Sequence, residues 1–200
     1  YKFIWNEYCD WYIELTKSKL TDSGPERVAA QNVLIHVLNS ALKLLHPFMP
    51  FITEEIWQKL PQDEDSIMVS KFPEFQEERT DAVVEKEMDT VMEVITGIRN
   101  IRGEMNLNPG LKLNVLVKTS NPKIKKTLQY QASYIRDLAR VEQLQTGAEI
   151  EKPKVSASSV LGEMDLIVLL EGMMDFKEER NRVEKELKKI EKDLIFLDKK

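Results

Sequence analysis

The sequence is short of the residues on which disulfides, metal sites and phosphate loops depend. Its single cysteine, Cys9, excludes a disulfide within the chain, and with two histidines it cannot supply a four-ligand zinc site without a carboxylate. Gly147 and Gly162 stand alone in expected turns, and no Gly-rich loop opens a helix after a strand. This composition favours a reducing, cytoplasmic location.

Long apolar runs and a signal-peptide pattern are also lacking. No run approaches the roughly 20 apolar residues of a membrane span, so no membrane partner is predicted. The chain begins at Tyr1, without an initiator methionine and already in helical periodicity, which favours an excised piece of a longer protein. With 200 residues and 42% hydrophobic content, it can form one large packed domain or two small ones.

The net charge of −5 conceals a strong segmental pattern. Residues 61–93 carry 3 basic and 11 acidic side chains, a balance of −8, whereas residues 94–140 carry 9 basic and 2 acidic, a balance of +7. A basic segment inside an acidic protein suits phosphate binding, because a nucleic acid responds to local positive potential. An open alternative is that the two segments neutralise each other across an intramolecular interface.

Residues 1–75 are predicted to form helices. In residues 1–20 an apolar stripe at helical spacing consists of Ile4, Tyr8, Trp11 and Leu15, widened by Trp5, Cys9 and Tyr12. The polar strip of the same helix consists of Asn6, Asp10, Glu14 and Lys17. Asn6, Asp10 and Lys17 form either a solvated surface or one that faces RNA. Pro25 suits the first position of a second, central helix.

In the sequence HPFMPFITEEIWQKL a histidine lies near two acids, Glu54 and Glu55, as in many general acid/base sites. A helix corner accounts for all three, since His46 ends the second helix and Pro50 or Thr53 begins a third. The two acids then occupy the first turn, where they complement the helix dipole. The inward stripe of this helix is expected to consist of Ile52, Ile56 and Leu60. No catalytic residue is predicted here.

Residues 76–173 are predicted to form a small α+β domain. One long helix is expected over residues 77–108, then a half-buried strand, LKLNVLV, and a helix from Asn121 to about Arg140. Three short strands follow in VEQLQTG, KVSASSVLG and MDLIVLLEG. Two helices flanking a small mixed or antiparallel sheet make an α+β layer.

Two groups of basic residues in this domain are candidate phosphate sites. Arg99, Arg102 and Asn106 share one strip of the long helix. The guanidinium groups of Arg99 and Arg102 could clamp adjacent phosphates or pair with the acids of residues 85–93. The second group consists of Lys123, Lys125 and Lys126. These lysines lie in the first turns of a helix, where the dipole does not favour cations, and so weakly indicate a phosphate partner.

From residue 174 to 200 a seven-residue apolar repeat is typical of a coiled coil. Its seam consists of Phe176, Arg180, Val183, Leu187, Ile190, Leu194 and Leu197. The candidate phosphate contacts of this segment, otherwise a solvated face, are Lys177, Arg180, Arg182, Lys185, Lys188 and Lys189. Because the seam needs a partner for its apolar side chains, we predict that this helix frays or forms a dimer, antiparallel with a second copy.

Four motifs in order resemble one protein family. FIWNEYCDWYIELTK followed by LLHPFMPFITEEIWQKL resembles the anticodon-binding helical bundle of the class I aminoacyl-tRNA synthetases for valine, isoleucine and leucine. Within that family, ITGIRNIRGEMNLNPGLKLNVLV and LGEMDLIVLLEGMMDFKEERNRVEKEL resemble the valine enzymes. The resemblance covers all 200 residues. The ATP-binding signatures of the family, His-Ile-Gly-His and Lys-Met-Ser-Lys-Ser, do not occur.

The resemblance implies a mainly α chain with a small α+β part. Its expected domains are a partial anticodon-binding helical bundle (1–75), an α+β linker domain (76–173) and the first helix of a coiled-coil arm (174–200). The whole enzyme would join valine to its tRNA using ATP and magnesium. These residues, with no cofactor of their own and attached to the rest of the synthetase chain, would position valine-accepting tRNA.

Two alternatives stay open. The same module in an isoleucine or leucine tRNA ligase should lack the terminal heptads. A stand-alone coiled-coil interaction protein should not bind tRNA.

Overall fold

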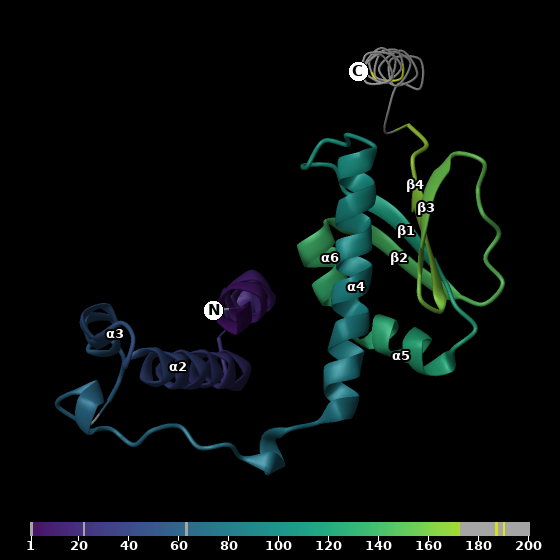
Figure 1. Cartoon of the computed structure of the whole chain (residues 1–200). Coiled ribbons are helices and arrows are strands. Elements are labelled where there is room, and N and C mark those ends of the chain that lie inside the picture. Colours follow the sequence, from purple (N-terminus) through teal and green to yellow (C-terminus); the bar gives the residue numbers. More distant parts are fainter. Residues whose placement is uncertain (1, 22, 63, 173–186, 188–189, 191–200) are drawn as a thin grey trace, which may run out of the picture. The chain divides into compact units, whose positions relative to one another are not determined.

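The computed structural model describes residues 2–21, 23–62, 64–172, 187 and 190. The chain divides into two compact units, residues 1–81 and 82–200 (Figure 1). Helices form the first unit, and the second adds a four-stranded sheet, so the predicted mainly α fold with a small α+β part is confirmed. The predicted coiled coil lies outside the described residues, apart from Leu187 and Ile190.

The first unit is built around a long central helix. A π-helix, η1 (Phe3–Tyr12), continues directly into α1 (Ile13–Thr21). The central helix is α2 (Pro25–Leu45), and α3 (Pro50–Trp57) follows it. Two single 3-10 turns, η2 (Ile67–Val69) and η3 (Glu77–Arg79), lie in the segment beyond α3. Helix α2 contacts both α1 and α3, which confirms its predicted central position.

The first helical segment departs from the predicted α-helical spacing. The backbone N–H of Ile13 donates to the carbonyl of Tyr8, five residues back, so the turns are wider than those of an α-helix. Tyr8 and Leu15 are buried as predicted, but Trp5 is 56% exposed and does not widen the buried stripe. The hydroxyl of Tyr8 donates a 3.0 Å hydrogen bond to the carbonyl of Leu34, which ties η1 to α2.

Helix α3 presents a different face to its neighbours from the one predicted. Thr53 and Trp57 are buried, whereas Ile52 and Ile56 are exposed. Trp57 packs with Leu42 and Ile67, and Leu38 and Leu60 line the same cluster. The indole buries more apolar surface than either isoleucine, so the helix turns this side inward.

The corner before α3 is confirmed, with one correction. His46 is the C-cap of α2, directly after Leu45, and its Nδ1 lies 2.8 Å from Oγ1 of Thr53. Because α3 begins at Pro50, Glu54 and Glu55 lie in its second turn and not in the first. Glu54 instead accepts hydrogen bonds from Ser66 and Ile67, and Glu55 pairs with Lys59.

The second unit packs three helices on one face of a mixed sheet (Figure 1). The helices are α4 (Ala82–Glu104), α5 (Pro122–Tyr130) and α6 (Ala132–Ala139). The strands are β1 (Leu113–Lys118), β2 (Val141–Gly147), β3 (Ser156–Leu161) and β4 (Met164–Leu169). Their order is β2-β1-β4-β3, with β2 parallel to β1 and the other pairs antiparallel.

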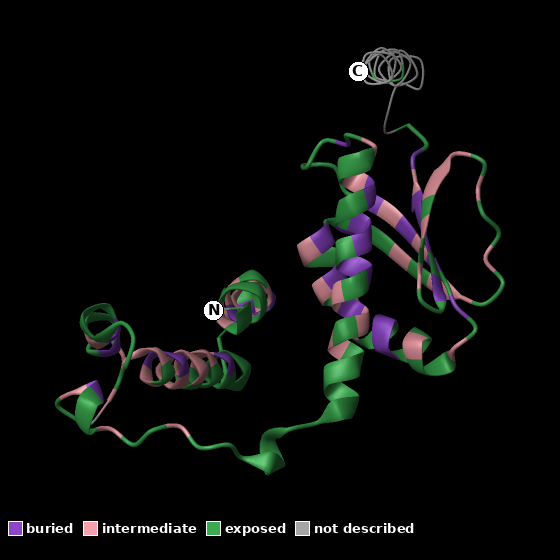
Figure 2. Ribbon diagram, in the orientation of Figure 1, coloured by how far each residue is buried: buried purple, intermediate pink, exposed green. Residues whose placement is uncertain are grey.

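The core of this unit lies between α4 and the sheet (Figure 2). Alternate residues of β1 are buried, as the half-buried pattern predicts. The fully buried side chains here include Val91, Val94, Ile95, Ile98, Leu113, Val115, Val117, Leu166 and Val168. Gly97 allows α4 to approach closely, because an added Cβ would lie 2.7 Å from Cδ2 of Leu166 and 2.9 Å from Cδ1 of Leu161.

The two predicted helices of this unit are shorter than expected. Helix α4 starts at Ala82 and not at residue 77, and Asn106 ends it in the left-handed conformation. The N–H of Leu107 donates to the carbonyl of Arg102, which closes a Schellman-type cap. The predicted helix over residues 121–140 is broken at Gln131 into α5 and α6.

Helix α2 has the length and mean hydropathy of a candidate membrane span, although polar residues interrupt its apolar sequence. Among the described residues it alone meets that test, with a mean hydropathy of 1.3. One such helix is weak evidence for a membrane, because core helices of soluble proteins pass the same test. Helix α2 contacts α1 and α3, and 17% of its apolar window is buried in the structure.

Candidate nucleic-acid interface

The predicted contacts in the first unit lie on its surface. Asn6 and Asp10 project from η1, and Lys17 from α1, and all three are exposed. The ammonium of Lys17 lies 2.5 Å from a carboxylate oxygen of Glu14. An exposed pair of this kind contributes little, typically below about 1 kcal/mol, so Lys17 can exchange it for a phosphate.

Arg99 and Arg102 bind backbone carbonyls that the sequence did not suggest as partners. Nε and Nη2 of Arg99 donate to the carbonyl of Leu138 at 3.3 and 3.0 Å. Nη2 of Arg102 donates to the carbonyl of Ala139 at 2.9 Å. These carbonyls belong to the last turn of α6, where the orphan acceptors of a helix attract cations.

The other end of the Arg102 guanidinium holds the turn before β1. Its Nη1 donates to the carbonyls of Asn108 at 3.1 Å and Leu111 at 2.9 Å. Burial, helped by the nearby charge of Arg140, lowers the pKa of Arg102 from its ordinary value. Arg102 therefore connects α4, α6 and the turn, and any phosphate contact would compete with this structural role.

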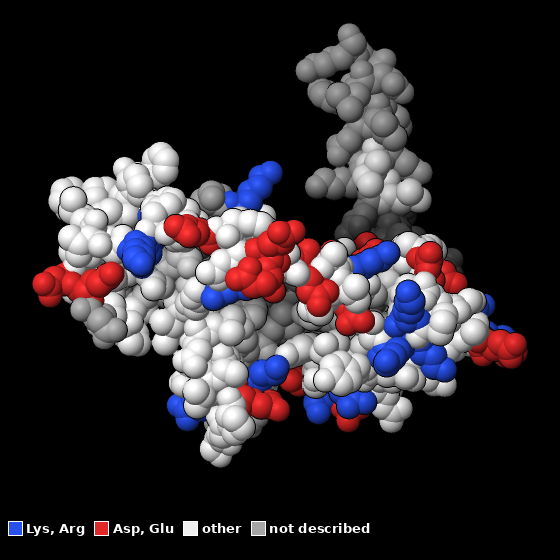
Figure 3. All heavy atoms as spheres, turned by 90° about the horizontal axis from the view of Figure 1, so that it is seen from below, with Lys and Arg blue, Asp and Glu red and all other residues white. Residues whose placement is uncertain are grey.

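The lysines of α5 form an exposed basic surface. Oδ1 of Asn121 accepts a 3.0 Å hydrogen bond from the backbone N–H of Lys123, so Asn121 caps the helix. The exposed residues of its first turns include Lys123, Lys125 and Lys126. Figure 3 shows Lys and Arg side chains gathered on the second unit, at the right of the view. In the described part of the chain, no ion pair engages these three ammonium groups.

The remaining candidates belong to the predicted arm. Lys177, Arg180, Arg182, Lys185, Lys188 and Lys189 lie outside the described residues.

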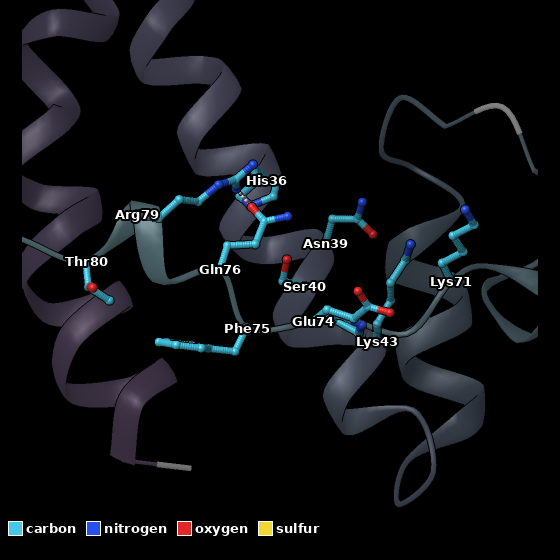
Figure 4. A pocket seen from close by; sticks show the side chains of 11 residues that line it. His36, Asn39, Ser40, Lys43, Lys71, Glu74, Phe75, Gln76, Arg79 and Thr80 are labelled. Carbon is cyan, nitrogen blue, oxygen red and sulfur yellow. Dashed lines mark hydrogen bonds between the residues drawn. The ribbon is translucent and has the colours of Figure 1, made fainter.

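Sequence patterns did not predict a polar pocket in the first unit. It has a volume of about 420 Å³ and lies between α2 and residues 71–80 (Figure 4). Helix α2 contributes His36, Asn39, Ser40 and Lys43, which share one face at three- and four-residue steps. The facing segment contributes Lys71, Glu74, Phe75, Gln76 and Arg79. The spacing of the polar residues on α2 could be recognised in the sequence. The segment that faces them has no periodic pattern, so the pocket itself could not be predicted.

Two hydrogen bonds orient side chains at this pocket. Nη1 of Arg79 lies 2.6 Å from Nε2 of His36 (Figure 4). A guanidinium can only donate, so Nε2 of His36 is the acceptor in this hydrogen bond. Oδ1 of Asn39 accepts a 2.7 Å hydrogen bond from Nε1 of Trp57, which leaves the amide donors of Asn39 for other partners.

Comparison with known proteins identifies the class. A family model described as the anticodon-binding domain of tRNA ligase matches residues 1–117, which include η1 to α4, most of β1 and the polar pocket. The chain belongs to this family of tRNA-ligase anticodon-binding domains.

The similar proteins show which group of tRNA ligases the chain resembles. The chain is 41% identical over its whole length to the valine–tRNA ligases of Syntrophotalea carbinolica and Nitratidesulfovibrio vulgaris. It is 38% identical over its whole length to that of Thermotoga maritima. The chain spans 23% of the first two relatives and 22% of the third, in their C-terminal part. The resemblance to the valine branch is thereby confirmed, and an isoleucine or leucine enzyme is not favoured.

Proposed function

We propose that this chain binds tRNA and positions it for aminoacylation by a catalytic region in the rest of a synthetase chain. The match of residues 1–117 to the anticodon-binding family carries the proposal. The exposed lysines of α5 support it, because ammonium groups that make no ion pair within the described residues suit the phosphates of a folded RNA. Such contacts would fix the position of the tRNA without reading its sequence.

The names of the relatives extend the proposal to the whole protein. It would join valine to valine-accepting tRNA in the cytoplasm, using ATP and magnesium at a site outside these residues. The predicted arm, residues 174–200, would add phosphate contacts through its basic side chains. Pairing of two copies through that arm is part of the same proposal.

Binding of a valine-accepting tRNA transcript at several salt concentrations tests this function. Changing Lys123, Lys125 and Lys126 together to Ala should weaken binding and make its salt dependence shallower by roughly one phosphate contact per lysine. The control is the pair of changes Lys59→Ala and Lys86→Ala, which remove exposed lysines next to acids. No binding at low salt, or an equal salt slope in the wild type and the triple variant, would contradict the proposal.

A further inference from the structure

We propose that the polar pocket between α2 and residues 71–80 holds one nucleotide of single-stranded RNA. The base would stack on Phe75, and the phosphate would lie among Lys43, Lys71 and Arg79. This inference rests on the RNA-binding function proposed above. The proposed function says only that the chain binds tRNA. This inference specifies that the first unit binds single-stranded RNA and names the side chains that contact it.

The volume and lining of the pocket suit a single nucleotide. Its 420 Å³ falls within the range of about 300–1,000 Å³ that is usual for small-molecule sites. The lining comes from one face of α2 and from residues 71–80. A base that occupied this pocket would have left its stack. A paired base in a duplex cannot do so without losing its partner, which favours single-stranded RNA.

Phe75 provides a stacking surface. Its side chain is 82% exposed, although it borders the pocket in a segment without regular secondary structure. Because its side chain is so exposed, Phe75 does not belong to the hydrophobic core of the first unit. Exposed aromatic side chains beside basic groups bind single strands, because every base offers an apolar face to the ring.

The charges around the pocket suit a phosphate. Lys43 comes from α2, while Lys71 and Arg79 come from the facing segment, and Glu74 is the acid among the lining residues. The lysine, arginine and glutamate side chains of the lining are three cations and one anion, a balance of +2. This local sign opposes the acidic balance of residues 61–93, so the basic side chains are concentrated where the pocket forms.

His36 acts as a positioning residue for Arg79. The 2.6 Å hydrogen bond uses Nη1 of the guanidinium, and the other N–H groups remain able to donate to a phosphate. Asn39, whose oxygen is engaged by Trp57, presents amide donors to acceptors on a base edge. An acidic peptide would satisfy the lysines but would leave Phe75 without a stacking partner, so the lining favours RNA.

The test uses the complete 200-residue chain and a single-stranded RNA heptamer with a central 2-aminopurine. Phe75→Ala should weaken heptamer binding about tenfold or more and leave its salt slope unchanged. Lys43→Ala and Lys71→Ala should each make the slope shallower by roughly 0.7. The matched controls are Phe51→Ala, which removes a phenylalanine that is 90% exposed on α3, and Lys59→Ala.

The same variants are also titrated with the tRNA transcript and with the heptamer annealed into a duplex. Weaker binding of Phe75→Ala to the heptamer, with duplex binding weak for every chain, supports the pocket. If Phe75→Ala binds the heptamer as tightly as Phe51→Ala does, the inference is wrong, even where the α5 triple variant shows that tRNA binding is real. If the wild type binds neither RNA, both this inference and the proposed function fail.

Discussion

Nε1 of Trp57 donates a 2.7 Å hydrogen bond to Oδ1 of Asn39 and so joins the buried cluster of the first unit to the lining of its polar pocket. Trp57 is 1% exposed, and its ring packs against Leu42 and Ile67. The contact therefore couples the packing of α3 to the orientation of a pocket side chain.

Asn39→Ala should destabilise the first unit by about 1–3 kcal/mol, because it leaves the indole N–H buried without an acceptor. Urea unfolding would measure the loss. In a Trp57→Phe background the same change should cost much less, since the donor is already absent. An equal cost in both backgrounds would show that the hydrogen bond is not responsible.

The two glycines of α4 should respond oppositely to alanine. At Gly97 the new Cβ would meet the buried side chain of Leu166 and the half-buried side chain of Leu161, and overpacking of this kind costs about 1–3 kcal/mol. At Gly103 nothing lies within 4 Å, so alanine should stabilise the helix by up to about 1 kcal/mol. Thermal unfolding of the two variants gives the comparison, and a stabilised Gly97→Ala would contradict the close packing of α4 on the sheet.

Removing the Arg102 guanidinium should destabilise the second unit. Arg102→Ala leaves the carbonyls of Asn108, Leu111 and Ala139 without this donor, and we expect a loss on the order of 2 kcal/mol. Arg102→Lys should restore little, because one ammonium cannot reproduce the planar fork. Lys126→Ala, which removes an exposed cation from the same unit, is the control for denaturant unfolding. If Arg102→Ala is as stable as the wild type, these hydrogen bonds do not stabilise the unit. The charge of Arg102 would then serve RNA binding alone.

Glu54 should make the first unit sensitive to acid. Hydrogen bonds from Gln58, and then from Ser66 and Ile67, lower the pKa of its carboxyl from the ordinary 4.5. Because the folded state has the lower pKa, the stabilisation is present above pH 4.5 and is lost as the pH falls through the folded value. Glu54→Gln should therefore lower the Tm at neutral pH and lower it less in acid.

Glu55→Gln serves as the comparison for Glu54. The pKa of Glu55 is also lowered, by its hydrogen bond and charge interaction with Lys59, but both side chains of that pair are exposed. High salt should diminish the effect of Glu55→Gln through screening and leave most of the effect of Glu54→Gln. Equal salt sensitivity of the two variants would indicate that Glu54 acts only through its charge.

Local patterns in the sequence determined several elements and the family. Proline at the first helical position predicted the start of α2 at Pro25, and the His46 corner predicted its end. The segment VEQLQTG was predicted as a strand and forms β2 within the same bounds, Val141–Gly147. Four motifs in order indicated the synthetase family, which the comparison confirmed. Each of these inferences depends on residues within one turn, strand or motif.

The tertiary structure decided which faces and partners those elements use. Trp57 and not Ile56 enters the core, because the cluster with Leu42 and Ile67 is completed by segments on either side of α3. Arg102 meets the carbonyl of Ala139 across 37 positions of sequence. His36 meets Arg79 across 43 positions, and that contact lies at the polar pocket. No local periodicity encodes such contacts, since they form only when packing brings distant segments together.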